Sequence, residues 1–145
     1  MIMPDVNVLI YAFRQDVSQY ALCRPWLDRV VQEDARFGIS PVALSAVVRV
    51  TTNPKSYSNP SSIEDAFGFC EDILSQPHCQ LLQPGDRHWD IFRRLCVETN
   101  TRGPRVTDAW FAALAIEWGC EWITMDRDYA RFPGLKWRTP ELPGR

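Results

Sequence analysis

Three aspartates stand where the chain passes from an extended segment or a loop into a helix or a turn. Asp5 lies between a short apolar run and an apolar helical pattern, and Asp108 lies in the first turn expected for an alanine-rich helix. Asp126 follows another short apolar run. Each aspartate alone is equally well explained as a helix cap or a turn residue. Carboxylates gathered at one place repel one another unless a cation neutralises them. Oxygen ligands without histidine or cysteine suit Mg²⁺ or Mn²⁺, which activates water and stabilises displacement at phosphate.

The elements that must position these aspartates alternate along the chain. Short runs typical of strands cover residues 1–3, 37–40, 79–82 and 122–124. Helical patterns cover residues 6–13, 18–31, 41–50, 86–98 and 107–118, the last with Thr107 as its N-cap. A further helical segment begins after Ser61 or Ser62 and ends near Pro77. Strands separated by helices predict an α/β fold with a mostly parallel sheet and helices on both faces, in one domain over residues 1–145.

The carboxyl ends of the strands are the expected place for a ligand. In parallel α/β sheets the binding crevice lies outside these ends. Ser40 ends one strand candidate, and Asp5 and Asp126 each follow another within two residues, so we expect all three at the same edge of the molecule.

The composition is that of an ordinary globular protein, with 46% hydrophobic and 23% charged residues. No basic segment precedes the first apolar run, and charged residues interrupt it early, so we expect no signal peptide or membrane span and a cytoplasmic location. The net charge of −2 does not by itself indicate a nucleic-acid binder. Of the 16 basic residues 14 are arginine, which suits phosphate binding, although a GC-rich coding bias is the favoured explanation.

No second catalytic set competes with the aspartates. The five cysteines are scattered without a C-x-x-C pair, which argues against disulfides and a zinc site and favours small core residues. His78 and His88 are the only histidines, and each lies near a helix or loop end, where a structural role is expected. The sequence also lacks G-x-S-x-G, P-loop and G-x-G-x-x-G motifs.

Four segments resemble the PIN-domain family, and within it the VapC toxins. They are Asp5-Val6-Asn7-Val8-Leu9-Ile10-Tyr11-Ala12, Arg49-Val50-Thr51-Thr52-Asn53-Pro54, Asp108-Ala109-x-x-Ala112-Ala113-Leu114-Ala115, and Thr124-x-Asp126-Arg127-Asp128-Tyr129-x-x-Phe132-Pro133-Gly134-Leu135. The resemblance covers nearly the whole chain, in order and at suitable spacing. It implies a PIN-like three-layer α/β/α fold and a Mg²⁺- or Mn²⁺-dependent ribonuclease. Such a toxin is held inactive by a small VapB-like antitoxin whose tail enters the active site.

The resemblance also assigns roles to residues. Asp5 and Asp108 would be metal ligands, and Asp126 a further acid of the cluster. Asn7 and Thr124 would orient carboxylates or substrate. Asp128 is the second choice for the last acid.

One departure from the family stands out. Its members usually carry a glutamate early in the helix after the second strand, yet residues 40–49 here contain no acid. Ser40 or Ser45 could hold a metal-bound water, but neither replaces a charge. Ala46 and then Leu44 are the first and second choices of position for restoring an acid. Three carboxylates hold a divalent ion less tightly than four, so we expect weak metal binding.

Substrate and partner contacts are predicted more broadly. Basic residues near the acidic motifs are candidates for phosphate binding, although each is also explained as a surface or salt-bridging residue: Arg14, Arg49, Arg102, Arg105 and Arg127. An apolar groove beside the acids is expected for the antitoxin. Trp110 and Trp118 fit a core or an interface, and the aromatic-bearing helices predict a homodimer.

Two alternatives remain open at this stage. A PIN-like fold short of one acid could bind RNA or an antitoxin without cutting RNA. A phosphatase or other α/β hydrolase could use Asp5 as its nucleophile, but its usual catalytic lysine has no evident place, because Lys55 and Lys136 are the only lysines.

Overall fold

The fold is built around a parallel sheet. The computed structural model describes residues 1–144. Within them the strands are β1 (Ile2–Pro4), β2 (Phe37–Ile39), β3 (Cys79–Leu81), β4 (Glu121–Ile123) and β5 (Trp137–Arg138), in the order β3-β2-β1-β4-β5. Each described strand pairing is parallel. The central strand β1 is short and almost fully buried, as expected for a strand with helices on both faces.

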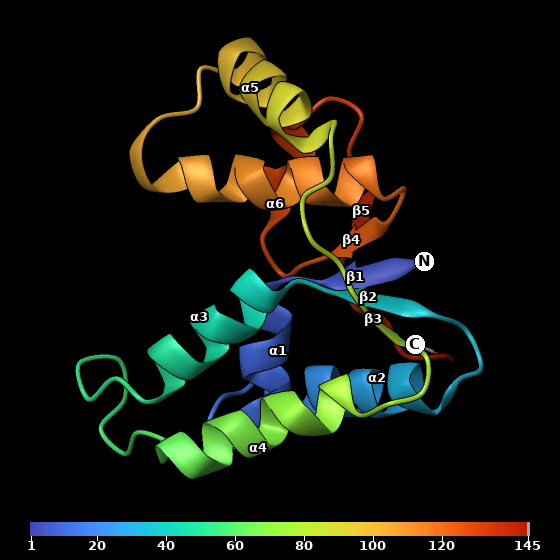
Figure 1. The fold of residues 1–145 in the computed structure, drawn as a ribbon. Coiled ribbons are helices and arrows are strands. Elements are labelled where there is room, and N and C mark those ends of the chain that lie inside the picture. The colour runs from blue at the N-terminus through green and yellow to red at the C-terminus, as the bar shows by residue number, and fades with distance from the viewer. Residues whose placement is uncertain (145) are drawn as a thin grey trace.

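Helices cover both faces of this sheet (Figure 1). The first face carries α1 (Val6–Phe13), α2 (Tyr20–Gln32), α3 (Pro41–Thr51) and α4 (Ile63–Leu74), and the other carries α5 (His88–Thr99) and α6 (Val106–Glu117). Two short 3₁₀ helices, η1 (Gly103–Arg105) and η2 (Arg127–Arg131), precede α6 and follow β4. The three-layer α/β/α prediction is therefore confirmed.

Helix α6 shows why the second layer needs two helices. Its buried residues, Ala109, Phe111, Ala112, Ala113, Leu114 and Ala115, lie on most sides of the helix. A helix that is apolar all round must be covered on more than one side. The sheet covers one side and α5, which packs along α6, covers another. The small alanine side chains allow this close approach, which fixes the start of α6 near the sheet edge.

The strand order places a topological switch point at the centre of the sheet. From β1 the chain moves to β2 and β3 on one side, whereas β4 and β5 lie on the other side of β1. The crevice outside the carboxyl ends of β1 and β4 is where ligands bind in such sheets. Asp5 follows β1 directly, and Asp126 follows β4 within three residues.

Most element predictions are confirmed, with ends shifted by up to about three residues. Ser62 is the N-cap of α4, since its hydroxyl accepts from the Asp65 amide. Thr107 as the N-cap of α6 is wrong: the Gly103-Pro104 turn runs straight into the helix, which begins at Val106. Strand β5 and both 3₁₀ helices were not predicted, because two to five residues carry no periodicity. None of the helices described for residues 1–144 is long and apolar enough to cross a bilayer.

Three of the five cysteines are core residues, as predicted. Within residues 1–144 all five are free, and Cys23, Cys70 and Cys120 are buried. Burial raises the pKa of these three thiols, so they remain protonated and pack as small apolar groups.

Candidate active site

A cavity of about 290 Å³ opens at the switch point of the sheet. Its wall comes from four parts of the chain: Asp5, Val6, Asn7, Ile10, Ala46, Arg49, Thr107, Asp108, Phe111, Asp126 and Tyr129. The three predicted acids therefore share one cavity, although more than 100 residues separate the first from the other two. The β1–α1, α3, α6 and β4–η2 segments meet there because their strands and helices converge at one sheet edge.

Asp5 is the deepest of the three acids, with 5% of its surface exposed. One carboxylate oxygen, Oδ1, accepts a hydrogen bond from the Val6 amide at 2.6 Å, and Oδ2 accepts one from the Thr124 hydroxyl at 2.7 Å. The pKa of Asp5 is raised to about 7, mainly by burial and to a smaller extent by the charges of Asp108 and Asp126, while the two hydrogen bonds oppose the rise. The carboxylate thus has neutral donors and no cation of its own beside it.

Thr124 connects Asp5 to the rest of the site. Its Oγ1 donates to Asp5 and accepts from the Asn7 side-chain amide at 3.3 Å and from the Asp126 backbone amide at 3.0 Å. The Asn7 carbonyl oxygen in turn accepts from the Met125 amide at 3.2 Å. A hydroxyl has one proton and two lone pairs, so this fully buried Thr124 uses its whole capacity. Asn7 and Thr124 thereby brace the segments that follow β1 and β4 against each other.

Asp108 is supported differently. It lies in the first turn of α6, where the helix dipole favours a carboxylate. The Tyr129 hydroxyl donates to its Oδ1 at 3.4 Å, and a guanidinium nitrogen of Arg131 lies 3.6 Å from its Oδ2. Burial raises the pKa of Asp108 and the positive charge of Arg131 opposes that rise. Asp108 is therefore held at the edge of the cavity by one neutral donor, Tyr129, and one positive charge, Arg131.

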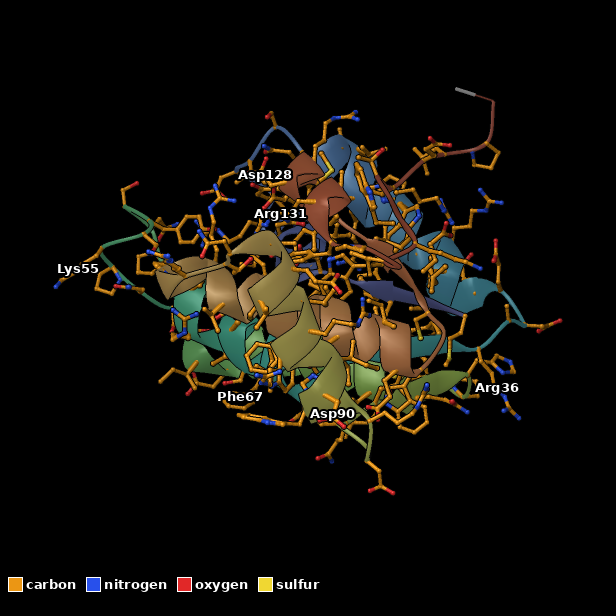
Figure 2. The ribbon with its side chains drawn as sticks, turned by 90° about the horizontal axis from the view of Figure 1, so that it is seen from above. Arg36, Lys55, Phe67, Asp90, Asp128 and Arg131 are labelled. Carbon is orange, nitrogen blue, oxygen red and sulfur yellow. The ribbon has the colours of Figure 1, made fainter. Side chains whose placement is uncertain are left out.

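Asp126 and Asp128 are two residues apart, but only Asp126 faces the cavity. The Oδ1 atom of Asp126 caps η2 by accepting from the Asp128 amide at 2.9 Å, while Asp126 itself lines the cavity. The Asp128 side chain is outside that lining and pairs with Arg105 at 3.1 Å. Figure 2 shows Asp128 and Arg131 close together on η2. The geometry therefore favours Asp126 over Asp128 as the third acid.

The donor set fits a hard, hydrated cation. Within residues 1–144 the cavity is lined by three carboxylates and by no histidine or cysteine. In this part of the chain no three acidic, histidine or cysteine side chains are close enough, as they stand, to enclose one ion. Mg²⁺ does not need such a cage, because it commonly binds one or two carboxylates and keeps several waters. The raised pKa of Asp5 gives a further reason for a cation here, since it marks a buried charge without a counter-charge.

Comparisons with known proteins show the family of the chain. The family model of the PIN domain matches residues 2–135. Ribonuclease VapC43 of Mycobacterium tuberculosis is 38% identical over 97% of this chain and 95% of its own length, and Ribonuclease VapC25 of the same species is 37% identical over 98% and 100%.

The chain belongs to the PIN-domain family, among the VapC proteins.

Solved structures show the same fold at low sequence identity. A complex described as VapBC2 from Rickettsia felis bound to a promoter DNA fragment contains a chain with a TM-score of 0.71 and 18% identity, covering 97% of this chain and 100% of that one. VapC20 of Mycobacterium tuberculosis, described as a Sarcin-Ricin loop cleaving toxin, gives a TM-score of 0.68 and 11% identity over 90% and 93%. Both likenesses concern the arrangement of the sheet and helices.

In this PIN-domain protein, helix α3 presents no acid to the site. Ala46 lines the cavity, whereas Leu44 is buried and lines an apolar groove between α3 and α4. Ser40 is used as the N-cap of α3, accepting from the Val42 and Ala43 amides, and Ser45 lines the groove. Neither serine lines the acidic cavity, so of the two positions considered for an acid only Ala46 faces it.

The predicted arginines divide into two groups. Arg49 lines the cavity together with the acids. Arg14 lies at the far end of α1, buried and held by Asp16, Ser61 and the ring of Tyr57, so the structure does not bring it to the acids. The others, Arg102, Arg105 and Arg127, are exposed and outside the lining.

Sequence reasoning missed Tyr129 and Arg131. Tyr129 was part of a family motif without a role, and Arg131 falls on an unspecified position of that motif. The signal available was spacing, since both follow Asp126 within five residues. Only the 3₁₀ turn of η2 brings them back to Asp108, and that turn was not predicted.

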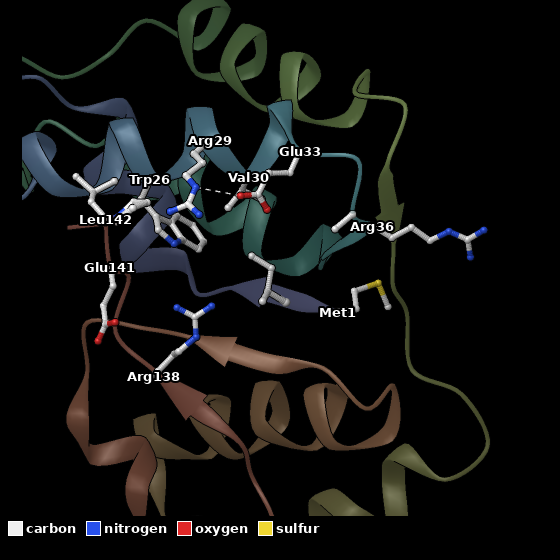
Figure 3. A pocket seen from close by; sticks show the side chains of 12 residues that line it. Met1, Trp26, Arg29, Val30, Glu33, Arg36, Arg138, Glu141 and Leu142 are labelled. Carbon is white, nitrogen blue, oxygen red and sulfur yellow. Dashed lines mark ion pairs between the residues drawn. The ribbon is translucent and has the colours of Figure 1, made fainter. Parts of the chain in front are cut away.

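A larger cavity, of about 700 Å³, lies elsewhere, between α2, the start of β1 and the C-terminal segment. Figure 3 shows the ion pair between Arg29 and Glu33 on its wall, and Arg138 bonds Glu121, which lies outside the lining, at 2.7 Å. None of the three clustered acids lines it. The smaller acidic cavity is therefore the better candidate for chemistry.

Proposed function

We propose that this PIN-domain protein is a divalent-metal-dependent endoribonuclease that acts in the cytoplasm as the toxin of a VapBC-type toxin–antitoxin pair. The observation that carries the proposal is the single cavity shared by Asp5, Asp108 and Asp126, with two of these acids held by fixed donors. Relatives of more than 35% identity over nearly the full chain are named VapC ribonucleases.

Each residue has a distinct part in this proposal. A bound Mg²⁺ or Mn²⁺ would supply a Lewis acid and a water of lowered pKa at the phosphate. Asp5 and Asp108 would hold the ion, and Asp126 would hold it or its waters. The Thr124 hydroxyl fixes the orientation of the Asp5 carboxylate by donating a hydrogen bond to it. Arg49 would bind a phosphate of the RNA backbone.

RNA cleavage with Mn²⁺ tests the proposal. Removing an outer partner of a metal ligand costs about 10- to 100-fold in activity, so losing a ligand costs about 100-fold or more. We expect Asp5→Asn and Asp108→Asn to show this loss, and a chelator to abolish wild-type cleavage. Asp128→Asn, the same change outside the cavity, should retain activity. Cleavage that survives the chelator and both variants would refute the proposal.

The phosphatase alternative finds no support in the arrangement of charges. Lys55 is exposed at the outer end of the loop between α3 and α4 (Figure 2), and Lys136 is exposed near β5. Neither lines the acidic cavity. The Asp5 carboxylate is also engaged through both oxygens, which is unfavourable for a nucleophile.

The antitoxin is proposed to occupy the groove between α3 and α4. This groove of about 590 Å³ is lined mainly by apolar residues, among them Pro41, Leu44, Val48, Phe67, Leu74 and Leu81. Phe67, Leu74 and Leu81 are each more than 40% exposed. Arg49 lines both the groove and the acidic cavity, so one segment can cover the groove and reach the acids. An apolar helix or tail is the kind of partner that fits.

Two charge-introducing variants test this partner site. We expect Phe67→Glu combined with Leu81→Glu to abolish complex formation with the VapB-like antitoxin while RNA cleavage persists. Ile63→Glu is the matched control, because Ile63 is an exposed apolar residue of α4 outside the groove. Unchanged binding in the double variant would place the antitoxin elsewhere.

We also propose a two-fold homodimer through α5. Trp89 and Val97 are both about two-thirds exposed and lie eight residues apart, on one face of the helix. Sedimentation should show a dimer that Trp89→Glu converts to a monomer. A wild-type monomer at tens of micromolar concentration would contradict this.

A further inference from the structure

Arg131 approaches Asp108 from outside the acidic cavity. One guanidinium nitrogen, Nη2, lies 3.6 Å from Oδ2 of Asp108, and Nη1 donates to the Asp128 carbonyl at 3.3 Å. The guanidinium carbon sits 4.4 Å from the centre of the Phe132 ring. Both side chains of the ion pair are about three-quarters buried, yet Arg131 does not line the cavity that Asp108 lines. Arg131 therefore supports the carboxylate from behind.

The hydrogen bonds of Arg131 alone do not explain why its guanidinium is buried beside Asp108. Within the described part of the chain, Nη2 of Arg131 is buried without a hydrogen-bond partner. A buried guanidinium nitrogen is costly unless an opposite charge compensates it. The charge it faces belongs to Asp108, which is itself repelled by Asp126 and carries a hydrogen bond from Tyr129 on its other oxygen.

We propose that Arg131 is the built-in counter-ion of Asp108, which balances the acidic cluster when no metal is bound and positions the carboxylate toward the cavity. The proposal deepens the proposed metal site and rests on it. Arg131 is a positioning residue, because it acts through Asp108 and lies outside the cavity where substrate would bind.

A counter-ion affects the stability of the metal-free and metal-bound protein differently, whereas a residue that only packs affects both equally. In the metal-free protein Arg131 relieves repulsion within the cluster, whereas in the metal-bound protein the divalent ion already does so. Arg131 therefore stabilises the metal-free state more than the metal-bound state. Removing its charge should lower metal-free stability and strengthen metal binding at the same time.

Thermal unfolding of Arg131→Met with and without Mn²⁺ tests this. Arg127→Met is the control, because Arg127 is an exposed arginine of the same 3₁₀ helix for which residues 1–144 offer no ion pair. We expect Arg131→Met to lower the metal-free Tm by about 2–4 °C relative to the control, and Mn²⁺ to restore most of that difference. Calorimetric titration should show Mn²⁺ bound about fivefold more tightly than by the wild type. Arg131→Lys should return both values toward the wild type.

Two results would overturn the proposal. An equal fall in Tm with and without Mn²⁺ would show that Arg131 only packs, and weaker Mn²⁺ binding in Arg131→Met would show that its charge aids the ion. A double-mutant cycle with Asp108→Asn decides the matter without metal. Arg131→Met should cost little once Asp108 is neutral, and fully additive losses would refute the ion pair. If the wild type itself does not respond to Mn²⁺, the proposed metal site fails, and the cycle still tests the counter-ion.

Discussion

Asp5 and Asp108 both stand at the start of a helix and face the same cavity, but their surroundings differ. Asp5 is almost fully buried and held by an amide and a hydroxyl, which are neutral donors. Asp108 is partly exposed and has a guanidinium beside it. The same residue type therefore carries an uncompensated charge at one position and a compensated charge at the other.

This difference shows that the chain offsets the desolvation of its buried carboxylates in two different ways. Desolvation at Asp5 is opposed by hydrogen bonds only, so its pKa rises to about 7. At Asp108 the positive charge of Arg131 limits the corresponding rise. We infer that Asp5 gains most from a bound cation and that Asp108 is already partly neutralised without one.

The largest expected effect on stability comes from removing the hydroxyl that supports Asp5. Thr124→Val removes a hydroxyl that bonds Asp5, Asn7 and Asp126 in a fully buried position. Buried groups left without partners cost about 1–3 kcal/mol each, so we expect a loss of about 3 kcal/mol in the free energy of unfolding. Denaturant unfolding measures it. Thr124→Ser keeps the hydroxyl and should recover most of the loss, and equal losses in both variants would contradict the hydrogen-bonding role.

Neutralising the two acids in turn should give opposite signs in the metal-free protein. Asp108→Asn leaves Arg131 without its counter-charge and should destabilise by about 1 kcal/mol. Asp5→Asn removes an uncompensated buried charge and should stabilise by about 1–2 kcal/mol at pH 8.

The Asp5 effect must also depend on pH. The folded-state pKa of about 7 lies above the ordinary value of 3.8, so the stability that the neutral carboxyl confers is present below about pH 4 and is lost as the pH rises through 7. The advantage of Asp5→Asn over the wild type should therefore shrink from pH 8 toward pH 4. Thermal unfolding across this range measures it, and a constant difference would contradict the burial argument.

A smaller effect is expected from adding an acid. Ala46→Glu places a fourth carboxylate on the cavity wall and should tighten Mn²⁺ binding about tenfold, because it adds attraction and ligand oxygens. Leu44→Glu would instead bury a charge beside the apolar groove and destabilise the fold. Calorimetric titration compares Ala46→Glu with the wild type. Unchanged affinity would show that another group already completes the site.

The smallest effect is expected at the exposed acid. Asp128 pairs with Arg105, and both side chains are more than half exposed, so Asp128→Asn should change stability by at most about 0.5 kcal/mol. Mn²⁺ binding should stay as in the wild type. A marked loss of metal affinity would move the third acid from Asp126 to Asp128.

Much of this arrangement could be predicted from the sequence. The alternation of periodic and extended segments is enough to predict the layers, and the position of Asp5 and Asp126 after strands is enough to predict the sheet edge where they meet. Burial dictates these patterns locally, which is why they can be recognised from the sequence. The boundaries shifted where a 3₁₀ turn entered a helix, as at Val106.

The residues that contact the acids could not be predicted in the same way. Arg131 and Asp108 are 23 positions apart, and their contact depends on a turn of five residues without any periodic signal. Likewise, Ala46 and Leu44 differ by about half a helical turn, so only the packing of α3 shows which one faces the cavity. Side-chain direction at such positions follows from tertiary contacts.

Calorimetric Mn²⁺ titration of the wild type and of Asp5→Asn, Asp108→Asn and Asp126→Asn tests the central claim most directly, with Asp128→Asn as the control. If the three acids form one metal site, each of the three variants should bind Mn²⁺ at least about tenfold more weakly than the wild type, with Asp5→Asn the weakest, and Asp128→Asn should match the wild type. Equal Mn²⁺ binding by the wild type and the three cavity variants would contradict the claim.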